Sequence, residues 1–352
     1  MIKKLANAVI LVFIGLYSLS FLAPYIDPNK SWVIALLGLA FPYLFVVGII
    51  ISVFLFTGSN RLKWLLIFVL APGIFKMSLF YRFGSTEKTS SDTSEISILS
   101  YNVRSFNRYR WIESDQITPE IISLVADKNP DVFFIQEFYA SSPEIRDSLV
   151  ESIKTKCKLP YYASFQSRAN GKANGLYTFS RYPIDDVSEE KFNKGGVNGI
   201  LACSILFKGK KIRLLNFHLQ SYQLTTAEET KLEKEQRIKN AFYKLRNGLK
   251  NRSSQVKMLR EKVLSYSLRG PLICGGDLND TPHSYAYRSL TDFLYDSYNE
   301  AGHGEGKTYA GKLPGFRIDY VLHNDKLKAV HYQSIKEKKS DHYPILVGLK
   351  LE

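Results

Sequence analysis

Apolar residues divide the chain into two parts. Three long apolar segments, roughly Leu5–Ile26, Trp32–Phe56 and Leu62–Phe80, fill the start of the sequence. Each is close to the ~20 residues that a helix needs to cross a bilayer. No small-residue cleavage site precedes Asp27 and two more apolar segments follow, so a signal peptide is the weaker interpretation. The pattern predicts a membrane anchor of about three transmembrane helices over residues 1–84.

The next stretch, residues 85–95, has a different composition. Its sequence, STEKTSSDTSE, is polar and small and has no apolar face. Such a composition is typical of a linker. We therefore expect a second domain over residues 96–352.

In that second domain, short apolar runs alternate with stretches at helical spacing. The runs predicted as strands are 96–103, 131–138, 175–184, 271–279, 316–324 and 342–351, with a hairpin over 200–219. A helix is predicted over 118–130, where Thr118-Pro119 marks its start, and a long, charged helix over 226–268. Many strands with few helices predict a layered, mixed α/β fold.

Charge adds a weak indication of the partner. The chain has 47 basic and 33 acidic residues, a formal net charge of +14, and the part after residue 85 retains +8 of it. A basic domain suits nucleic acid or an anionic lipid surface, although solubility explains this charge nearly as well. The three cysteines, Cys157, Cys203 and Cys274, lie far apart, which argues against a disulfide framework or a zinc site.

Basic residues in the short loops predict an orientation in the membrane. One side carries Lys3, Lys4, Arg61 and Lys63, and the other carries Lys30 and Arg82. Four against two predicts a cytoplasmic N-terminus, and three crossings then place the second domain outside the cytoplasm. One extra or missing span reverses this.

Polar residues stand at or near the ends of six apolar runs. They are Asn102, Glu137, His218, Asp277, Asn279, Asp319, Asp341 and His342. One such residue is usually a cap or a turn, but catalytic sites of α/β sheets gather at strand ends, and six independent caps are a poor explanation. Carboxylates and amides suit Mg²⁺, and histidines add proton transfer and charge stabilisation. This set fits metal-dependent phosphoester hydrolysis.

The stretch ICGGDLNDTP, residues 273–282, contains two of these residues. Side chains two apart on an extended segment point to the same side, so Asp277 and Asn279 are expected to reach one point. Gly275 and Gly276 would leave room for something bulky beside the backbone. An Asx-type turn after a strand end is the alternative.

Seven motifs occur in a fixed order along residues 96–352: SYNVRSF, DVFFIQEF, GLYTFSRYPI, LLNFHLQS, GGDLND, RIDYVL and SDHYPILV. By these motifs the second domain resembles the endonuclease/exonuclease/phosphatase superfamily, whose fold is DNase I-like. The resemblance implies a four-layered α/β sandwich with the site at one end of two packed sheets.

The resemblance also implies a metal site. Asn102 and Glu137 would hold Mg²⁺, with Mn²⁺ as an alternative ion and Glu137 as the central ligand. Asp341 would be a second metal ligand.

Catalytic roles are implied by the same motifs. Asp277 would orient or deprotonate the attacking water, and Asn279 would steady the water or the phosphate. His342, oriented by Asp319, would contact the scissile phosphate. His218 would stabilise charge in the transition state.

Several further residues have open roles. For Arg104 a position near a phosphate is set against a solvated side chain, and for Arg181 a contact with substrate is set against a strand-end role. Asn174 precedes the strand of the third motif and is a candidate to reach the site. The histidines outside the motifs are His283, His303, His323 and His331, and surface or turn roles are expected for them.

The substrate stays open, because members of the superfamily cleave DNA, RNA, abasic sites, sphingomyelin and inositol phosphates. A membrane anchor disfavours a cytoplasmic repair enzyme. Three hypotheses remain: a nuclease, slightly favoured by the basic domain; a phospholipid or sphingolipid phosphodiesterase or phosphatase at the bilayer; and a subunit that uses the fold for binding protein partners in a membrane complex. The basic segment 225–250 departs from the family pattern, and it is either a face for anionic lipid or nucleic acid or a solvated helix.

Overall fold

The computed structural model describes residues 1–352 apart from 59, 85–94, 170–171, 194–195, 223–232 and 312–315. Its internal contacts divide the chain into two compact units. Unit 1 comprises Met1–Tyr81, Ser221–Ser254 and Asp280–Ser289, and unit 2 comprises Arg82–Gln220, Gln255–Asn279 and Leu290–Glu352. Nearly all of the predicted linker 85–95 lies outside the described residues, and the predicted domain boundaries stay a prediction.

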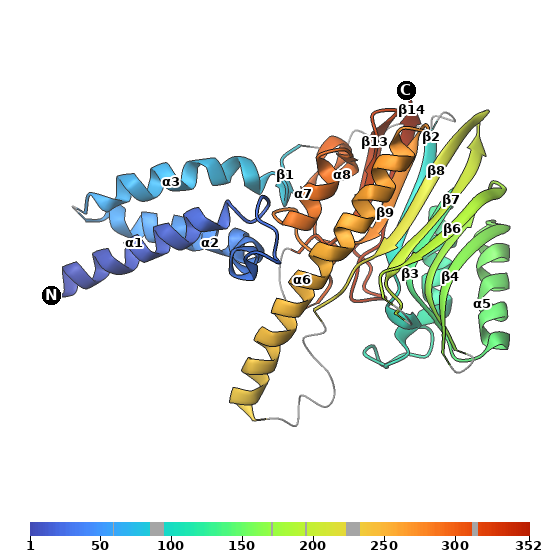
Figure 1. Cartoon of the computed structure of the whole chain (residues 1–352), viewed down its shortest axis with the longest axis horizontal. Helices are drawn as coiled ribbons and strands as arrows, with labels where there is room; N and C mark the ends of the chain where they lie inside the picture. Colours follow the sequence, from blue (N-terminus) through green and yellow to red (C-terminus); the bar gives the residue numbers. More distant parts are fainter. Residues whose placement is uncertain (59, 85–94, 170–171, 194–195, 223–232, 312–315) are drawn as a thin grey trace. The chain divides into compact units, whose positions relative to one another are not determined.

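Unit 2 is built on two six-stranded sheets (Figure 1). The first has the strand order β13-β14-β2-β3-β5-β4. Its strands are β2 (Glu95–Asn102), β3 (Val132–Ala140), β4 (Tyr161–Ala169), β5 (Lys172–Ser180), β13 (Leu327–Ser334) and β14 (Ile345–Leu351). The second has the order β10-β12-β9-β8-β7-β6. Its strands are β6 (Ile184–Lys191), β7 (Gly199–Phe207), β8 (Lys210–His218), β9 (Leu272–Asp277), β10 (Tyr295–Asp296) and β12 (Asp319–His323).

The helices and minor elements complete the chain. After the N-terminal helices they are β1 (Tyr81–Arg82), η1 (Arg104–Asn107), α4 (Ile117–Lys128), α5 (Pro143–Lys156), α6 (Lys234–Ser267), α7 (Tyr285–Thr291), α8 (Ser297–Ala301) and β11 (Gly304–Glu305).

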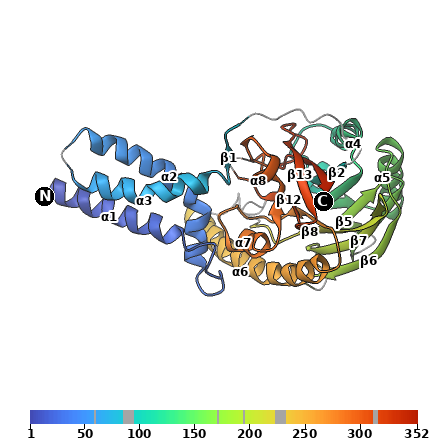
Figure 2. The same cartoon turned by 90° about the horizontal axis from the view of Figure 1, so that it is seen from above.

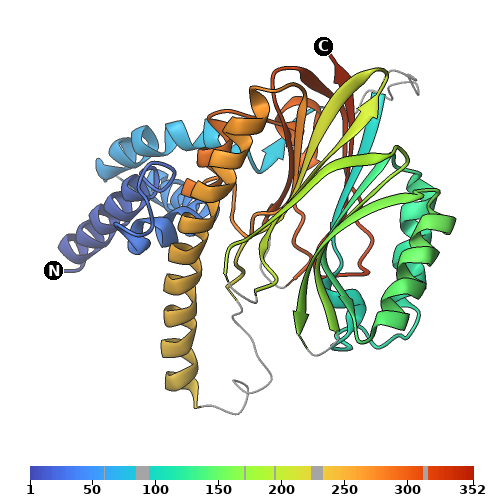
Figure 3. The same cartoon turned by 45° about the vertical axis from the view of Figure 1, so that its right-hand side comes forward.

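Strand alternation explains why the two sheets stack. Ile98 and Phe134 face the second sheet and pack with Leu214 and Ile273, whereas their neighbours Leu99 and Phe133 face the opposite way. Helices α4 and α5 cover that outer face of the first sheet (Figure 3). The second half of α6 runs along the second sheet, where Val256, Leu259 and Val263 are buried (Figure 2). These four layers confirm the predicted α/β sandwich.

The strands and helices of eight or more residues that the sequence pattern missed are β4, β6, β13 and α5. Strand β6 reads IDDVSEEK, is mostly exposed, and lies at the edge of its sheet. Edge strands carry charge that blocks further pairing, so they lack a regular apolar alternation. Helix α5 begins with a capped turn, in which Ser142 Oγ accepts from Ile145 N at 3.3 Å, ahead of Pro143.

Three helices form at the N-terminus: α1 (Ile2–Ser20), α2 (Trp32–Phe56) and α3 (Leu62–Met77). Helix α1 stops six residues before the predicted end at Ile26, because Pro24 has no N–H to continue it. Helices α1 and α2 are long and apolar enough to cross a membrane. Helix α3 has 16 residues, or about 24 Å against a hydrocarbon core of about 30 Å. Two of the three predicted helices therefore have the length and composition to span a membrane, and the three-helix anchor stays a prediction.

The N-terminal helices pack into a bundle with an apolar exterior. Tyr17, Phe41 and Leu66, one from each helix, are fully buried in its core. Large apolar side chains also cover the outside, including Phe54 at 73% exposed, Phe68 at 77% and Phe75 at 80%. Apolar exteriors of this kind mark surfaces that are covered by lipid or protein.

Candidate functional site

The candidate site lies where strands of both sheets end. Strand β8 pairs in parallel with β9, which sets His218 opposite Asp277. Strand β12 pairs with the other side of β9, which sets Asp319 opposite Asp277 as well. In the first sheet, β2 pairs in parallel with β3, so that Asn102 lies beside Gln136 and one residue from Glu137. Each local cluster therefore follows from strand register.

Asn102 joins the two clusters. Its Nδ2 donates to Glu137 Oε1 at 3.1 Å and to Asp277 Oδ2 at 2.9 Å. Its Oδ1 accepts from Arg104 N at 3.0 Å. One fully buried amide thus links carboxylates that come from different sheets.

Asp277 and Asn279 lie together, although not for the expected reason. Strand β9 ends at Asp277, and Asn279 has a left-handed φ of +55° instead of an extended backbone. Asn279 N donates to Asp277 Oδ1 at 2.8 Å, which is the Asx turn that stood as the alternative. Asn279 Nδ2 donates to Asp277 Oδ2 at 3.0 Å and to Leu219 O at 2.9 Å. The turn, and not the strand period, brings the two side chains together.

The two glycines before this turn make room for the protein's own chain. A Cβ on Gly275 would come within 2.7 Å of the Phe134 ring. Gly276 has φ +150°, and a Cβ there would overlap the Phe217 carbonyl. The expectation that they accommodate something bulky was right, but the neighbours belong to the adjoining sheet and strand.

His342 is held by Asp319. Its Nδ1 lies 2.9 Å from Asp319 Oδ2 and 3.1 Å from Oδ1, and its Nε2 lies 3.7 Å from Asp277 Oδ2. Burial alone would lower the pKa of His342, but the carboxylates of Asp319 and Asp277 outweigh burial and hold the pKa well above its usual value. The carboxylates thus favour the protonated ring, and Asp319 is placed to accept from Nδ1–H.

The pKa of His218 is shifted in the opposite direction. Its Nε2 lies 3.7 Å from Glu137 Oε1 and 3.6 Å from Asp277 Oδ2, and it is buried with no hydrogen-bond partner among the described residues. Burial lowers the pKa of this imidazole more than the nearby Asp277 raises it. A buried and unsatisfied ring nitrogen is suited to an oxygen of a bound substrate.

Two carboxylates of the site, Asp277 and Glu137, have pKa values raised by their surroundings. Burial, followed by repulsion from Asp319, raises the pKa of Asp277 to about 6. Burial, followed by repulsion from Asp341, raises the pKa of Glu137. A pKa near neutrality suits Asp277 to general-base catalysis.

Glu137 and Asp341 are the groups best suited to hold a divalent cation. Glu137 sits in a bulge of β3 with φ +55° and is 29% exposed, and Asp341 Oδ2 lies 3.1 Å from an Arg104 guanidinium nitrogen. Ligand atoms of Asp277, Asp319 and His342 also lie within 4.8 Å of one another. However, His342 Nδ1 and Asp319 Oδ2 are already engaged in a hydrogen bond with each other. A cation beside Glu137 would relieve the repulsion from Asp341, and a reversed Asn102 amide would present its oxygen. The donor set fits a hard, oxygen-preferring ion.

Two polar residues beneath the site were missed. Gln136 Nε2 donates to Asn216 Oδ1 at 2.8 Å, and Asn216 Nδ2 donates to the carbonyls of Ile135 and Tyr177 at 3.2 and 2.9 Å. This fully buried pair connects β3 to β8 just before Glu137 and His218. The available signal was a polar residue inside an apolar run, next to a site residue in the motifs IQEF and NFH.

The residues with open roles separate clearly. Arg181 binds Asn129 Oδ1 at 2.9 Å and Asp131 at 3.5 Å, so it fastens a loop. Arg104 lies at the site through Asp341, and Asn174 lies on β5 opposite Tyr139. Of the remaining histidines, His283 lies in a turn as expected but is fully buried, and the expected surface or turn role is wrong for His323, which is fully buried on β12.

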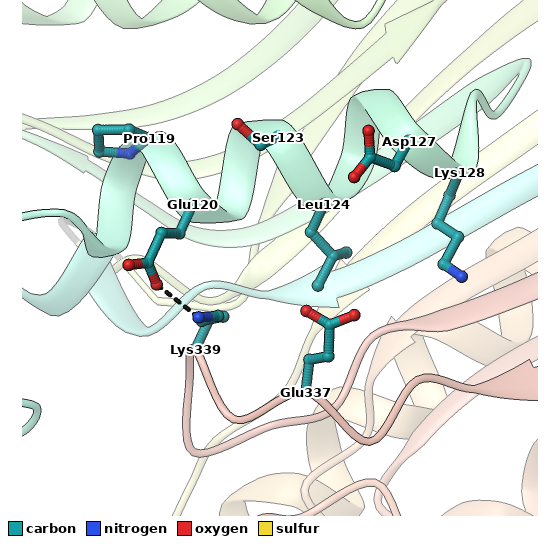
Figure 4. A pocket seen from close by; sticks show the side chains of 8 residues that line it. All are labelled: Pro119, Glu120, Ser123, Leu124, Asp127, Lys128, Glu337 and Lys339. Carbon is teal, nitrogen blue, oxygen red and sulfur yellow. Dashed lines mark hydrogen bonds and ion pairs between the residues drawn. The ribbon is translucent and has the colours of Figure 1, made fainter.

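A surface pocket of unit 2 lies between α4 and the loop before β14 (Figure 4). Its lining includes Asp127 and Glu337, and Lys339 Nζ lies 2.6 Å from Glu120 Oε2 across it. None of the eight candidate site residues lines this pocket. We assign it no part in the chemistry.

Known proteins resemble both parts of the chain. A family model described as Endonuclease/Exonuclease/phosphatase family matches residues 99–342, and one described as Domain of unknown function (DUF8431) matches residues 3–80. Human sphingomyelin phosphodiesterase 2 is 28% identical over 191 residues, which cover 49% of this chain and 44% of that protein. The match thus spans less than half of the relative's length.

Solved structures share the fold of unit 2. An endonuclease/exonuclease/phosphatase from Beutenbergia cavernae DSM 12333 is 16% identical with a TM-score of 0.54, over 73% of this chain and 72% of that one. Humanized D. rerio TDP2 is 18% identical with a TM-score of 0.53, over 73% of this chain and 100% of that one. These similarities show the fold alone. Because the family model covers more than half of the sequence and its motifs meet at one site, this chain belongs to the endonuclease/exonuclease/phosphatase family, a family of phosphoester hydrolases.

Proposed function

We propose that the protein is a membrane-held, divalent-metal-dependent phosphodiesterase. The observation that carries this proposal is the convergence of two buried histidines on one carboxylate. His218 and His342 both place Nε2 within 4 Å of Asp277 Oδ2, and their surroundings shift the two imidazole pKa values in opposite directions, His342 upward and His218 downward. Hydrolysis of a phosphodiester needs a base for water and donors for the phosphate oxygens, and this arrangement supplies both.

Asn102, Glu137 and Asp341 would hold the ion, with Mg²⁺ preferred and Mn²⁺ as an alternative. When bound, the ion neutralises charge on the phosphate and on the leaving oxygen. Oxygen donors without thiolates support this choice of metal.

The other side chains perform the proton transfer and the orientation. Asp277 accepts the proton of the attacking water, and its raised pKa gives it the basicity for this at neutral pH. Both N–H groups of the Asn279 amide are engaged, which leaves its carbonyl oxygen to align the water. His342 and His218 donate to phosphate oxygens through Nε2, and Asp319 keeps the His342 ring in place.

For the substrate we favour a phospholipid or sphingolipid head group over nucleic acid. The first half of α6 carries five basic residues and one acidic residue over 234–246, as suits either polyanion. It also exposes Ile238, Phe242 and Tyr243, at 48%, 51% and 64%. Exposed aliphatic and aromatic side chains among basic ones are typical of helices that lie on a bilayer. The apolar N-terminal helices and the relative named sphingomyelin phosphodiesterase 2 support the same choice.

The test is cleavage of a small substrate panel by the full chain in lipid nanodiscs with Mg²⁺. The panel holds sphingomyelin, phosphatidylcholine, phosphatidylserine, plasmid DNA and RNA. We expect turnover of a lipid, its loss with EDTA, and a fall of about 10³-fold in Asp277→Asn. Asp325→Asn, an exposed carboxylate in the loop after β12, is the matched control and should retain full activity.

Each other outcome has a definite meaning. Cleavage of DNA or RNA alone makes the protein a membrane-held nuclease and overturns the lipid assignment. Turnover that persists in EDTA contradicts the proposed dependence on a divalent metal ion. If no member of the panel is cleaved, a binding role in a membrane complex gains weight, and isolation of stoichiometric partners in mild detergent becomes its test.

A further inference from the structure

The segment that follows the candidate catalytic residues belongs to the helical unit. Residues Asp280–Ser289 group with the N-terminal helices and with Ser221–Ser254, whereas Asp277 and Asn279 group with the sheets. One peptide bond, from Asn279 to Asp280, joins the two. Contacts that fix the position of Asp280–Ser289 therefore also restrict the turn that carries Asp277 and Asn279.

His283 is the centre of this attachment. Its ring is fully buried and stacks on Phe41 of α2, with ring centroids 4.1 Å apart and planes at 28°. Its Nε2 lies 3.1 Å from the carbonyl of Ser20, the last residue of α1. A carbonyl only accepts, so Nε2 carries the proton. Burial lowers the pKa of His283 to about 4, and the neutral tautomer is therefore the one present at pH 7.

The backbone at His283 also approaches α2 closely. Gly38 lies three residues before Phe41, on the same side of α2. A Cβ on Gly38 would come within 2.9 Å of the His283 carbonyl oxygen and would also overlap Ala23. The glycine is therefore required by this approach.

A second route runs from the connection between α1 and α2 through α6. Asp27 Oδ1 accepts from Ser253 Oγ at 2.5 Å. The adjacent Arg252 is buried and donates through Nε to Asp280 Oδ2 at 3.0 Å. Asp280 is the residue bonded to Asn279, so both routes converge within four residues of the catalytic turn.

We propose that the N-terminal helices position the catalytic turn: Phe41 of α2 and the end of α1 clamp His283, and thereby fix the backbone that carries Asp277 and Asn279. This inference rests on the proposed hydrolase function. The helices are then part of the catalytic apparatus in addition to being an anchor. His283 and Phe41 act through Asp277 and are positioning residues that do not touch substrate.

Two matched pairs of variants test the clamp in the full chain in nanodiscs. Phe41→Leu removes the ring that stacks on His283, and Phe45→Leu makes the same change one turn later in the same buried cluster. Gly38→Ala places a methyl against the His283 carbonyl, and Gly15→Ala places one on α1 where nothing lies within 4 Å. We expect kcat to fall about tenfold in Phe41→Leu and Gly38→Ala, with KM unchanged, because geometry and not binding is disturbed. The two control variants should keep kcat within twofold.

Amide hydrogen exchange gives a second measurement that needs no turnover. Exchange across 278–284 should rise at least tenfold in Phe41→Leu and stay at the wild-type rate in Phe45→Leu. His283→Gln, which keeps a donor near the Nε2 position, should retain more kcat than His283→Ala. Equal effects of Phe41→Leu and Phe45→Leu on kcat and on exchange would overturn the clamp. A wild-type protein without turnover would instead contradict the proposed function, and the exchange comparison would still decide the clamp.

Discussion

Glu137 is the single residue on which metal binding is expected to depend most. Its carboxylate lies in a bulge near Asp341, and burial with that repulsion raises its pKa in the absence of an ion. Mg²⁺ at about 100-fold over its Kd should raise the free energy of unfolding by about 2.7 kcal/mol. Glu137→Gln should lose that gain in a thermal melt and lose about 10³-fold in activity.

The control for this prediction is Glu189→Gln, which changes an exposed glutamate on β6. It should keep the full Mg²⁺-dependent shift in Tm. A normal shift in Glu137→Gln would place the ion at Asp277, Asp319 and His342 instead, the other group whose ligand atoms lie close together.

The pH dependence of kcat/KM should be bell-shaped. Activity should rise with pH as Asp277 ionises, with its pKa raised to about 6 by burial and then by Asp319. It should fall at alkaline pH as His342 loses its proton, since Asp319 and Asp277 hold the pKa of His342 well above its usual value. Asp319→Asn removes a negative charge that raises both pKa values. Both limbs should therefore move to lower pH, by about one unit.

A profile measured for Asp325→Asn should coincide with the wild type, because that side chain is exposed and distant in the fold. Limbs that move apart, or that do not move, in Asp319→Asn would mean that Asp319 does not act on Asp277 and His342.

At the same scale, the sequence identified the site residues better than it explained them. Polar residues at the ends of apolar runs were sufficient to select Asn102, Glu137 and Asp277, and strand register does place them within hydrogen-bond distance. The Asx turn at Asn279, and the opposite pKa shifts of His218 and His342, depend on burial and on neighbours from other strands. Such long-range effects leave no mark on a local pattern.

Among the elements, α6 makes the sharpest prediction. Ile238 and Phe242 lie one turn apart and are half exposed, and Gln236 lies about 200° around the helix from Ile238. A cysteine-linked fluorophore at Ile238→Cys or Phe242→Cys should be quenched by brominated lipid in nanodiscs that contain phosphatidylserine. The label at Gln236→Cys should not be quenched. The native cysteines are buried and should remain unlabelled.

Phosphatidylserine provides the internal control for α6. Because attraction between basic residues and anionic lipid adds to apolar insertion, quenching should weaken in pure phosphatidylcholine and at high salt. Equal, weak quenching at all three positions would show that this half of α6 is a solvated helix.

The boundaries of a strand were predictable where both of its faces are buried. All six residues of β9 are buried, and its apolar run was recognised without difficulty. The edge strand β6 was not recognised, because half of its surface and its charges face solvent. The grouping of Asp280–Ser289 with the N-terminal helices joins residues that are over two hundred positions apart. No periodicity along the chain encodes that contact.

For the whole molecule, the side of the membrane on which the sheets lie depends on α3. Two crossings return unit 2 to the side of the N-terminus, whereas three place it on the opposite side. Helix α3 is short, but Phe68 and Phe75 on its outer face are 77% and 80% exposed, as expected of a lipid-facing surface. We therefore expect three crossings and, from the basic loops, a sheet unit outside the cytoplasm.

An impermeant maleimide applied to intact cells or spheroplasts measures this directly. Thr155 on α5 is exposed and lies far from the site residues in sequence. Because Cys157, Cys203 and Cys274 are buried, the thiol of Thr155→Cys is expected to be the one that reacts with the maleimide. We expect labelling before lysis, and no labelling of the wild type. Labelling of Thr155→Cys only after lysis would mean that α3 does not cross, and a lipid substrate would then have to be reached from the cytoplasmic leaflet. Lys4→Cys is the reciprocal control. With three crossings and a cytoplasmic N-terminus, it should be labelled only after lysis, whereas Thr155→Cys is labelled before lysis.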